Sequence, residues 1–286
     1  SPISVHNNRF NSFSSLSSDK YKYLSLFSFF KYTIVVKIPY LRDSFVRLGT
    51  PVSNILLGAF KNTFILATTS ILIALFLGIL LGVFSAIYKD SLIDKFILFI
   101  SVLGMSLPSF FASIIIAWFF GFVLHSYTGL NMTGSLYEID DYGRGKFLQI
   151  NNLILPAFTL GIRPLSVIIQ LCRNSLLEVL SLNYIRTGVA KGLSKFSIIF
   201  KHALRNALNP VVTAISGWFA SMLAGAVFVE YIFAWNGIGQ EIVHALNNMD
   251  LPVVMGAVLL ISSIFVIINM IVDLIYMWLD PRIRII

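Results

Sequence analysis

Residues 62–87 read NTFILATTSILIALFLGILLGVFSAI, and none of these side chains is charged. A helix over this stretch would be about 39 Å long at 1.5 Å per residue, and the hydrocarbon core of a bilayer is about 30 Å thick. Four further stretches are of similar length and contain at most one charged residue, namely 96–124, 147–172, 206–229 and 251–272. Five such segments predict an all-α, polytopic membrane protein and argue against a soluble helical domain.

The predicted transmembrane helices cover about 62–87, 96–122, 153–172, 207–229 and 253–279. The first of them carries a small residue at every fourth position: Ser70, Ala74, Gly78, Gly82 and Ala86. These residues form one stripe, so we expect another helix to pack closely against it. Pro108 lies inside the second predicted helix, where it removes a backbone donor and should kink the helix.

The net charge of +8 is divided unevenly between alternate connectors. Ten Lys and Arg residues lie in 88–95, 173–205 and the C-terminal tail, whereas the connectors 123–152 and 230–252 hold two. Basic loops remain in the cytoplasm, so 173–205 and the C-terminus are predicted to be cytoplasmic. Topology therefore accounts for the positive charge, and no nucleic-acid partner is indicated.

Residues 1–61 are predicted to form a partly ordered outer region that precedes a transmembrane domain at 62–286. An odd number of spans places this region outside, although its eight Lys and Arg residues would also suit a cytoplasmic basic tail. The apolar patch 23–36 is too short to span a bilayer, so we expect it to lie at the interface or to pack against the domain. Because the chain begins with Ser, we also expect a sixth, N-terminal span upstream of it.

The third predicted helix has a polar face. Its members follow the three- and four-residue spacing of a helix and are Arg163, Ser166, Gln170 and Asn174. Arg163 would lie about 15 Å into the helix, near the bilayer midplane, where contact between a charge and lipid is costly. It should therefore face the interior of the bundle or water.

The last predicted helix adds Asn269 and Asp273 at a matching spacing. One interpretation of the two polar faces is a translocation pathway. The alternative is a buried structural network in which Arg163 pairs with Glu230 or Asp273. Intramembrane charges favour the functional interpretation.

Nothing in the sequence indicates an enzyme. There is no GxxxxGK[ST] loop, no HExxH and no CxxC, and the four His residues are scattered. Cys172 is the only cysteine. We therefore expect no metal or other cofactor on this chain.

The predicted cytoplasmic segment 176–205 is more ordered than a simple connector. Two helix-forming halves are separated by Gly188 and Gly192, and Ser194 is placed to cap the second half, which has an apolar face. A helix, a glycine turn and a second helix with an apolar face predict docking to a cytoplasmic partner.

Several stretches of the chain resemble the membrane subunits of ABC importers, most closely the oligopeptide/dipeptide/nickel permease family. In chain order they are LLGVFSAIYKDSLIDKF, SLPSF, ILPAFTLGIRPLSVIIQLCRNSLLEVLS, YIRTGVAKGLSKFSIIFKHALRNALNP, AGAVFVEYIFAWNGIGQEIV and INMIVDLIYMWLDPRIR. The resemblance covers about 45–286. The widely quoted importer signature begins Glu-Ala-Ala where this chain has Arg186-Thr187-Gly188, a difference that favours the peptide branch.

The resemblance implies a complex of several subunits. A second homologous permease subunit pairs with this one, two cytosolic ATPase subunits bind ATP and Mg²⁺ below, and an extracytoplasmic peptide-binding protein docks above. A short coupling helix at about 188–197 would sit in a groove of the ATPase. The coupling residues implied here are Arg186, Thr187, Gly188, Ala190, Lys191, Gly192, Leu193 and Ser194.

The resulting functional prediction is a permease subunit that moves short peptides across the cytoplasmic membrane by alternating access, with ATP hydrolysed on separate subunits. Three alternatives remain open at this point. One is ABC import of nickel or another small solute, and another is a secondary transporter driven through Arg163 and Asp273. The third is a scaffold or assembly protein without a pathway.

Overall fold

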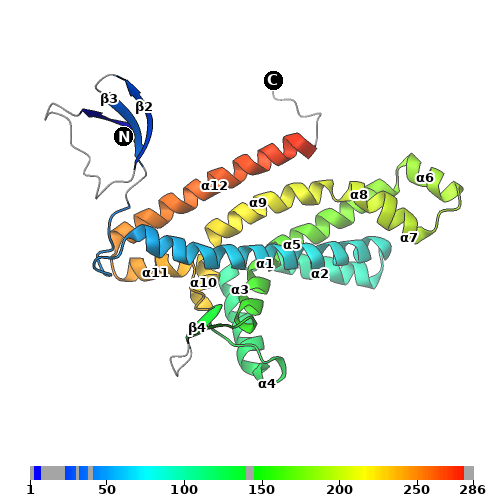
Figure 1. Ribbon diagram of the computed structural model, residues 1–286. Helices are drawn as coiled ribbons and strands as arrows, with labels where there is room; N and C mark the ends of the chain where they lie inside the picture. The colour runs from blue at the N-terminus through cyan, green and yellow to red at the C-terminus, as the bar shows by residue number, and fades with distance from the viewer. Residues whose placement is uncertain (1–2, 8–22, 30–31, 38–40, 140–144, 280–286) are drawn as a thin grey trace.

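A computed structural model of the chain describes residues 3–7, 23–29, 32–37, 41–139 and 145–279. The protein is mostly helical, and three long helices run through it (Figure 1). They are α1 (Val52–Ile87), α5 (Asn151–Leu180) and α12 (Leu251–Leu279). All three contain stretches long and apolar enough to cross a membrane, which agrees with the predicted helical membrane protein.

The second predicted span is broken into two helices. α2 (Leu92–Ser106) and α3 (Ser109–Ile116) meet at an angle of 112°. The backbone of Leu107 and Pro108 is extended. The proline ring drives the preceding Leu107 out of the α region, and Pro108 is the N-cap residue of α3. α3 continues through a π-helical turn, η1 (Ala117–Val123), into α4 (His125–Thr128), and this arm points away from the long helices (Figure 1). At the expected kink, the helix axis therefore turns by 112°.

The fourth predicted span is also divided. α9 (Asn209–Gly225) is followed by α10 (Val227–Ile232), and then by α11 (Ile238–Asn247). With 17 residues, α9 is about 26 Å long and falls slightly short of the hydrocarbon thickness. Among the described residues three helices satisfy the criteria for a span, or four if α2 and α3 count as one. The count of five therefore stays a prediction.

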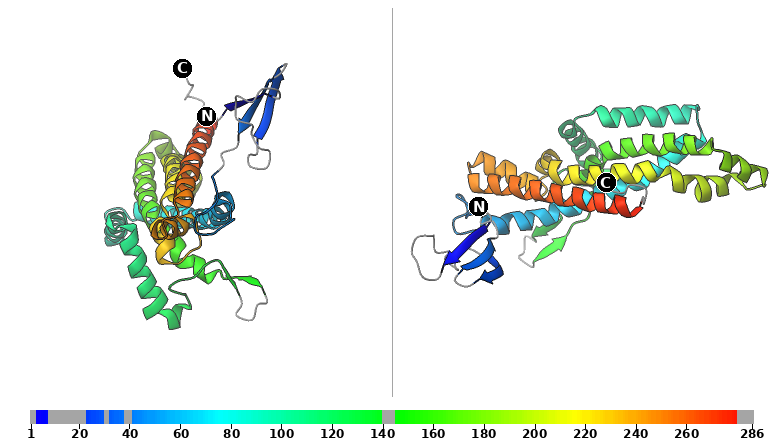
Figure 2. Two further views of the ribbon diagram at one scale, coloured as in Figure 1. Left: turned by 90° about the vertical axis from the view of Figure 1, so that its left-hand side faces the viewer. Right: turned by 90° about the horizontal axis from the view of Figure 1, so that it is seen from above.

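The most extensive helix–helix contact among the described residues lies between α1 and α5, which run side by side (Figure 2). The predicted small-residue stripe forms this contact. A Cβ on Gly78 would lie 2.6 Å from Cγ2 of Ile168, so only glycine permits this approach. Ala74 and Cys172 are completely buried in the same cluster. The stripe thus acts as the packing surface that the sequence predicts.

Small sheets accompany the helices. β1 (Ile3–Asn7), β2 (Tyr23–Phe29) and β3 (Tyr32–Lys37) form an antiparallel sheet in the order β1–β3–β2. The patch that was expected at the membrane interface is therefore largely β2 and β3. A second antiparallel pair, β4 (Tyr137–Ile139) and β5 (Lys146–Leu148), lies between α4 and α5. α1 begins at Val52, ten residues before the predicted boundary at 61/62.

The end of α5 leads into a compact group of short helices. These are α6 (Asn183–Ala190), α7 (Lys195–Ser197), the π-helical η2 (Ile198–Ala203) and α8 (Leu204–Ala207). They lie at the opposite end of the long helices from α11 (Figure 1). The group α6–α8 and the helix α11 therefore mark the two opposite ends of the helix bundle.

Candidate functional site

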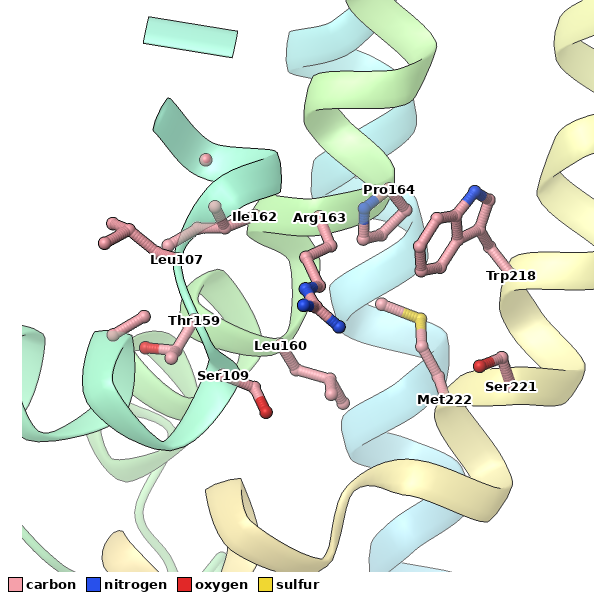
Figure 3. A pocket seen from close by; sticks show the side chains of 12 residues that line it. Leu107, Ser109, Thr159, Leu160, Ile162, Arg163, Pro164, Trp218, Ser221 and Met222 are labelled. Carbon is pink, nitrogen blue, oxygen red and sulfur yellow. The ribbon is translucent and has the colours of Figure 1, made fainter. Parts of the chain in front are cut away.

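A cavity of about 160 Å³ lies where α5, the α2–α3 break and α9 meet. Arg163 of α5 extends into it, with Ser109 on one side and Trp218 and Met222 on the other (Figure 3). The break at Pro108 places the start of α3 against α5, and the polar face of α5 supplies the charge. Arg163 therefore faces a cavity inside the bundle, as its predicted depth requires.

The charge of Arg163 is not balanced within the described part of the chain. The two ion pairs found there are Arg47–Glu241 and Asp94–Arg173, and no hydrogen bond is formed by the Arg163 guanidinium. The residues that line the cavity include no acidic side chain. An exposed guanidinium thus faces a space with hydroxyl groups and apolar walls.

The predicted alternative paired Arg163 with Glu230 or Asp273. Glu230 of α10 is fully buried, and its Oε2 accepts a 2.6 Å hydrogen bond from the N–H of Gly239 at the start of α11. It therefore ties α10 to α11 and is not the partner of Arg163. The side chain of Asp273 lies outside the described residues.

The rest of the predicted polar face is divided between different neighbours. Ser166 is buried against Gly104 of α2 and donates to the carbonyl of Ile162 at 2.9 Å. The Nε2 atom of Gln170 donates to Sδ of Met105 at 3.4 Å. Both side chains face α2, and neither is among the residues that line the cavity. Their role in a translocation pathway stays a prediction.

Two other predicted pathway residues lie outside this cavity. Asn174, near the end of α5, is exposed and accepts a 3.1 Å hydrogen bond from Nη1 of Arg173. Asn269 is half-buried on α12. Helical spacing places residues on one face, but the neighbouring helices decide which part of that face borders a cavity.

A charged cluster that the sequence did not predict links three helices near the far end of the bundle. The Asp94 carboxylate of α2 accepts two hydrogen bonds of 2.7 Å from Nε and Nη2 of Arg173 in α5. It also accepts from the Ser85 hydroxyl of α1 and from the N–H of Asp90 at 2.9 Å. The Ser91 hydroxyl caps α2 by accepting from the N–H of Asp94. The spacing from Ser91 to Asp94 is a helix-start signal that could have located α2.

The predicted coupling segment folds as helix, turn and helix. α6 ends in a Schellman motif, in which the N–H groups of Gly192 and Leu193 donate to the carbonyls of Val189 and Gly188. Gly192 has φ of +79°, the left-handed conformation that this motif requires. The Ser194 hydroxyl then accepts from the N–H of Ser197 at 3.3 Å and caps α7, as predicted.

The bounds of this motif differ from the expectation. The helix expected over 188–197 is located at Asn183–Ala190, and 191–194 form the turn. Gly188 lies inside α6 and does not break it, because only Gly192 adopts a positive φ in this segment. Arg186, Thr187 and Ala190 are exposed on α6, and Lys191, Leu193 and Ser194 are exposed in the turn.

The segment is anchored on one side and exposed on the other. Ile185 and Ile198 are buried in the same cluster as Leu176 and Val179 near the end of α5. Apolar side chains on the outer side remain accessible, with Phe196 71% exposed and Val189 59% exposed. A surface of this kind can bind a partner and transmit a displacement to α5.

Comparison with known families identifies this architecture. The model of the family described as "Binding-protein-dependent transport system inner membrane component" matches residues 78–285. The chain belongs to this family. The match includes the α2–α3 break, Arg163, the Asp94–Arg173 pair and the whole of α6–α8.

Several curated relatives of this chain are permeases. The chain is 39% identical over 254 residues to the dipeptide transport system permease protein DppB of Haemophilus influenzae, which covers 83% of this chain and 75% of the relative. It is 35% identical over 252 residues to DppB of Alkalihalophilus pseudofirmus, with 84% and 76% covered. The oligopeptide transport system permease protein AppB of Bacillus subtilis is 38% identical over 241 residues, with 84% and 75% covered.

Two solved ABC transporter structures have a fold similar to that of this chain. One is an inward-facing structure of the MetNI methionine ABC transporter, with a TM-score of 0.55 at 17% identity, covering 77% of this chain and 96% of that one. Another is an amino acid ABC transporter with histidines, with a TM-score of 0.54 at 11% identity and 78% and 93% covered. The predicted resemblance to ABC importer membrane subunits is confirmed.

Proposed function

We propose that this chain is the permease subunit of an ATP-driven importer of short peptides. The relatives named as dipeptide and oligopeptide permeases support this proposal and favour it over nickel import or a secondary transporter. The observation that carries it is the coupling segment, which is anchored through Ile185 and Ile198 while its apolar outer side is exposed. A scaffold protein without a translocation pathway would not need a segment that is anchored to α5 and exposes an apolar surface to a partner.

The coupling residues act through packing. Two cytosolic ATPase subunits bind ATP and Mg²⁺ and receive α6 and the 191–194 turn in a groove. Val189, Leu193 and Phe196 supply the apolar contact, and exposed Arg186 and Lys191 surround it. When the ATPase subunits close, the groove moves, and Ile185 and Ile198 pass the movement to α5. The chain itself catalyses no step.

The pathway runs beside the Arg163 cavity. α5 links this cavity to the coupling segment through one continuous helix, and the Asp94–Arg173 pair makes α2 move with it. A displacement at α6 therefore changes the relation between α5 and the α2–α3 break. This gives alternating access once a second, homologous permease subunit supplies the opposite wall.

The chain is oriented with α6–α8 and the C-terminus in the cytoplasm, because basic connectors remain on that side. α4, the β4–β5 pair and α11 then face outward, where an extracytoplasmic peptide-binding protein docks. The residues that precede α1 would lie on the same outer side. This topology fits the position of α6–α8 at the opposite end of the long helices from α11 (Figure 1).

A cross-linking experiment tests the proposal. A cysteine is introduced at Leu193 in a Cys172→Ser background, and the chain is expressed with the ATPase, permease and binding-protein genes of its operon. We expect Leu193→Cys to cross-link to an ATPase subunit, whereas Tyr127→Cys on α4 should not. Cross-linking of the ATPase at Tyr127 and not at Leu193 would refute the orientation and the coupling role together.

A further inference from the structure

We propose that the Arg163 cavity is a subsite for the C-terminal residue of a peptide in transit. The guanidinium takes the free α-carboxylate, and Leu160, Trp218 and Met222 surround the last side chain. This inference rests on the proposed peptide import and makes it more specific. It places a recognition step for one end of the substrate within the membrane domain.

The charge of the cavity selects an anion. Arg163 contributes its only charged group, and among the described residues the guanidinium has no carboxylate or carbonyl acceptor. Figure 3 shows it reaching into open space between α3 and α9. A planar guanidinium offers two parallel N–H donors to one carboxylate, which is the bidentate geometry that arginine recognises best.

The depth of the charge argues that it has a ligand. Arg163 lies about 18 Å from the start of α5 and about 26 Å from its end. Both distances place it well inside the thickness of a bilayer, where a charge without function is disfavoured. Arg173, a largely buried cation on the same helix, is paired with the carboxylate of Asp94. Arg163 differs because its guanidinium faces a cavity and has no acidic partner among the described residues.

The size and walls of the cavity indicate which part of a peptide enters. A volume of about 160 Å³ has room for one residue and not for a whole peptide. Leu160 and Trp218 are half-buried and Met222 is buried, so these walls are apolar and favour a nonpolar terminal side chain. The hydroxyls of Ser109 and Ser221 form no hydrogen bond within the described part of the chain and remain available to the carboxylate or the last peptide group.

The test uses the intact transporter, with both permeases, the ATPases and the binding protein, in proteoliposomes. Uptake of the tripeptide Ala-Ala-Phe is compared with uptake of its C-terminal amide. The affinity of the isolated binding protein for each peptide is measured separately. The acid-to-amide ratio of uptake is then divided by the acid-to-amide ratio of these affinities. We expect the wild type to retain about a tenfold preference for the free acid, which the Arg163→Gln variant loses.

Two further variants separate recognition from folding. Arg163→Lys keeps the charge but not the two-pronged geometry, so an intermediate preference is expected. Lys89→Gln removes an exposed basic residue from the α1–α2 connector and should keep the full preference. If Arg163→Gln fails to assemble, the acid-to-amide ratio of Arg163→Lys decides, and a ratio equal to that of the wild type overturns the inference.

The remaining outcomes are also decisive. Uptake of both peptides with the same ratio in Arg163→Gln and wild type would overturn the subsite and leave peptide import intact. A wild type that takes up neither peptide would contradict the proposed function itself. If the effect of Arg163→Gln follows the content of anionic lipid and not the C-terminal group, the guanidinium binds a lipid phosphate and the subsite is refuted.

Discussion

Arg173 of α5 donates two hydrogen bonds of 2.7 Å to the carboxylate of Asp94 at the start of α2. The side chain of Asp94 is 2% exposed and that of Arg173 is 14% exposed, so the pair is largely removed from water. Ser85 of α1 completes the cluster by donating its hydroxyl to the same carboxylate. Three helices are therefore joined at one point, about two turns before α5 ends.

Breaking this pair from one side should be costly. Asp94→Ala leaves a buried guanidinium without its acid, and the expected loss of stability is about 3–5 kcal/mol. The double variant Asp94→Ala/Arg173→Leu should recover much of this loss because no charge is left unpaired. The measurement is thermal unfolding of the purified complex in detergent.

The Arg47–Glu241 pair provides the control for that experiment. Its side chains are 49% and 24% exposed, so Arg47→Gln should lower stability by about 1 kcal/mol or less. Equal losses for Asp94→Ala and Arg47→Gln would show that the Asp94 cluster does not hold the helices together.

The two glycines of the coupling segment should respond differently to substitution. Val at Gly192 must adopt φ near +79°, which costs about 1–2 kcal/mol and disrupts the end of α6. Gly188 is helical, and an added Cβ would meet only Cδ1 of Leu193 at 3.4 Å. We expect Gly192→Val to insert normally but to lower peptide-stimulated ATP hydrolysis, while Gly188→Ala keeps it. The reverse order would contradict the assigned turn.

The two sides of the coupling segment should also be separable. Ile198 is 6% exposed, and Ile198→Ala should destabilise the segment by about 2–4 kcal/mol through a cavity next to α5. Phe196 is 71% exposed, so Phe196→Ala should leave stability unchanged and weaken binding of the ATPase. Thermal unfolding and co-purification of the ATPase distinguish the two effects. Unaltered ATPase binding in Phe196→Ala would remove this side chain from the interface.

Acid should release the segment before α1 from the α11–α12 turn. Asp250 accepts hydrogen bonds from the Ser44 hydroxyl and from the N–H of Phe45 at 3.1 Å. Burial raises the pKa of this carboxyl, but the hydrogen bonds from Ser44 and from backbone N–H groups outweigh burial, and its pKa lies below the usual value. A lowered pKa contributes stability above about pH 4 and loses it as the pH falls through the folded-state pKa.

A fluorophore on Leu48→Cys in the Cys172→Ser background measures this release. Leu48 is 88% exposed, so labelling should not disturb packing. The anisotropy should fall below about pH 4 in the parent chain. In Asp250→Asn it should show no such transition. A pH response that is the same in Asp250→Asn would exclude this carboxyl as its cause.

Sequence patterns predicted the packing face of α1, the start of α7 and the bend at Pro108. Each of these features depends on residues that are close together in the sequence. The small-residue stripe through Gly78 identified the face of α1 that meets α5, and Ser194 identified the start of α7. A proline in an apolar run predicted a bend at Pro108, although not its 112° extent. That angle depends on how α3 packs against α5 and α10, which no local pattern encodes.

Other features could not be predicted from spacing. Arg163 and Ser166 lie only three residues apart on α5, yet one faces a cavity and the other faces Gly104 of α2. Asp94 and Arg173 are 79 residues apart and meet only through the fold. Gly188 and Gly192 are equal as residue types, and the hydrogen bonds at the end of α6 select Gly192 for the turn. In each case the deciding information is the neighbour in space.

The central claim is that ATP hydrolysis on partner subunits moves peptides through this chain. The most direct measurement is uptake of labelled Ala-Ala-Phe into sealed vesicles that contain the intact complex, with the coupling segment and ATPases facing the lumen and the binding protein outside. The account predicts uptake only with ATP trapped inside, and loss of uptake in Gly192→Val while the complex stays assembled. Uptake driven by an ion gradient without ATP, or unchanged in Gly192→Val, would contradict it.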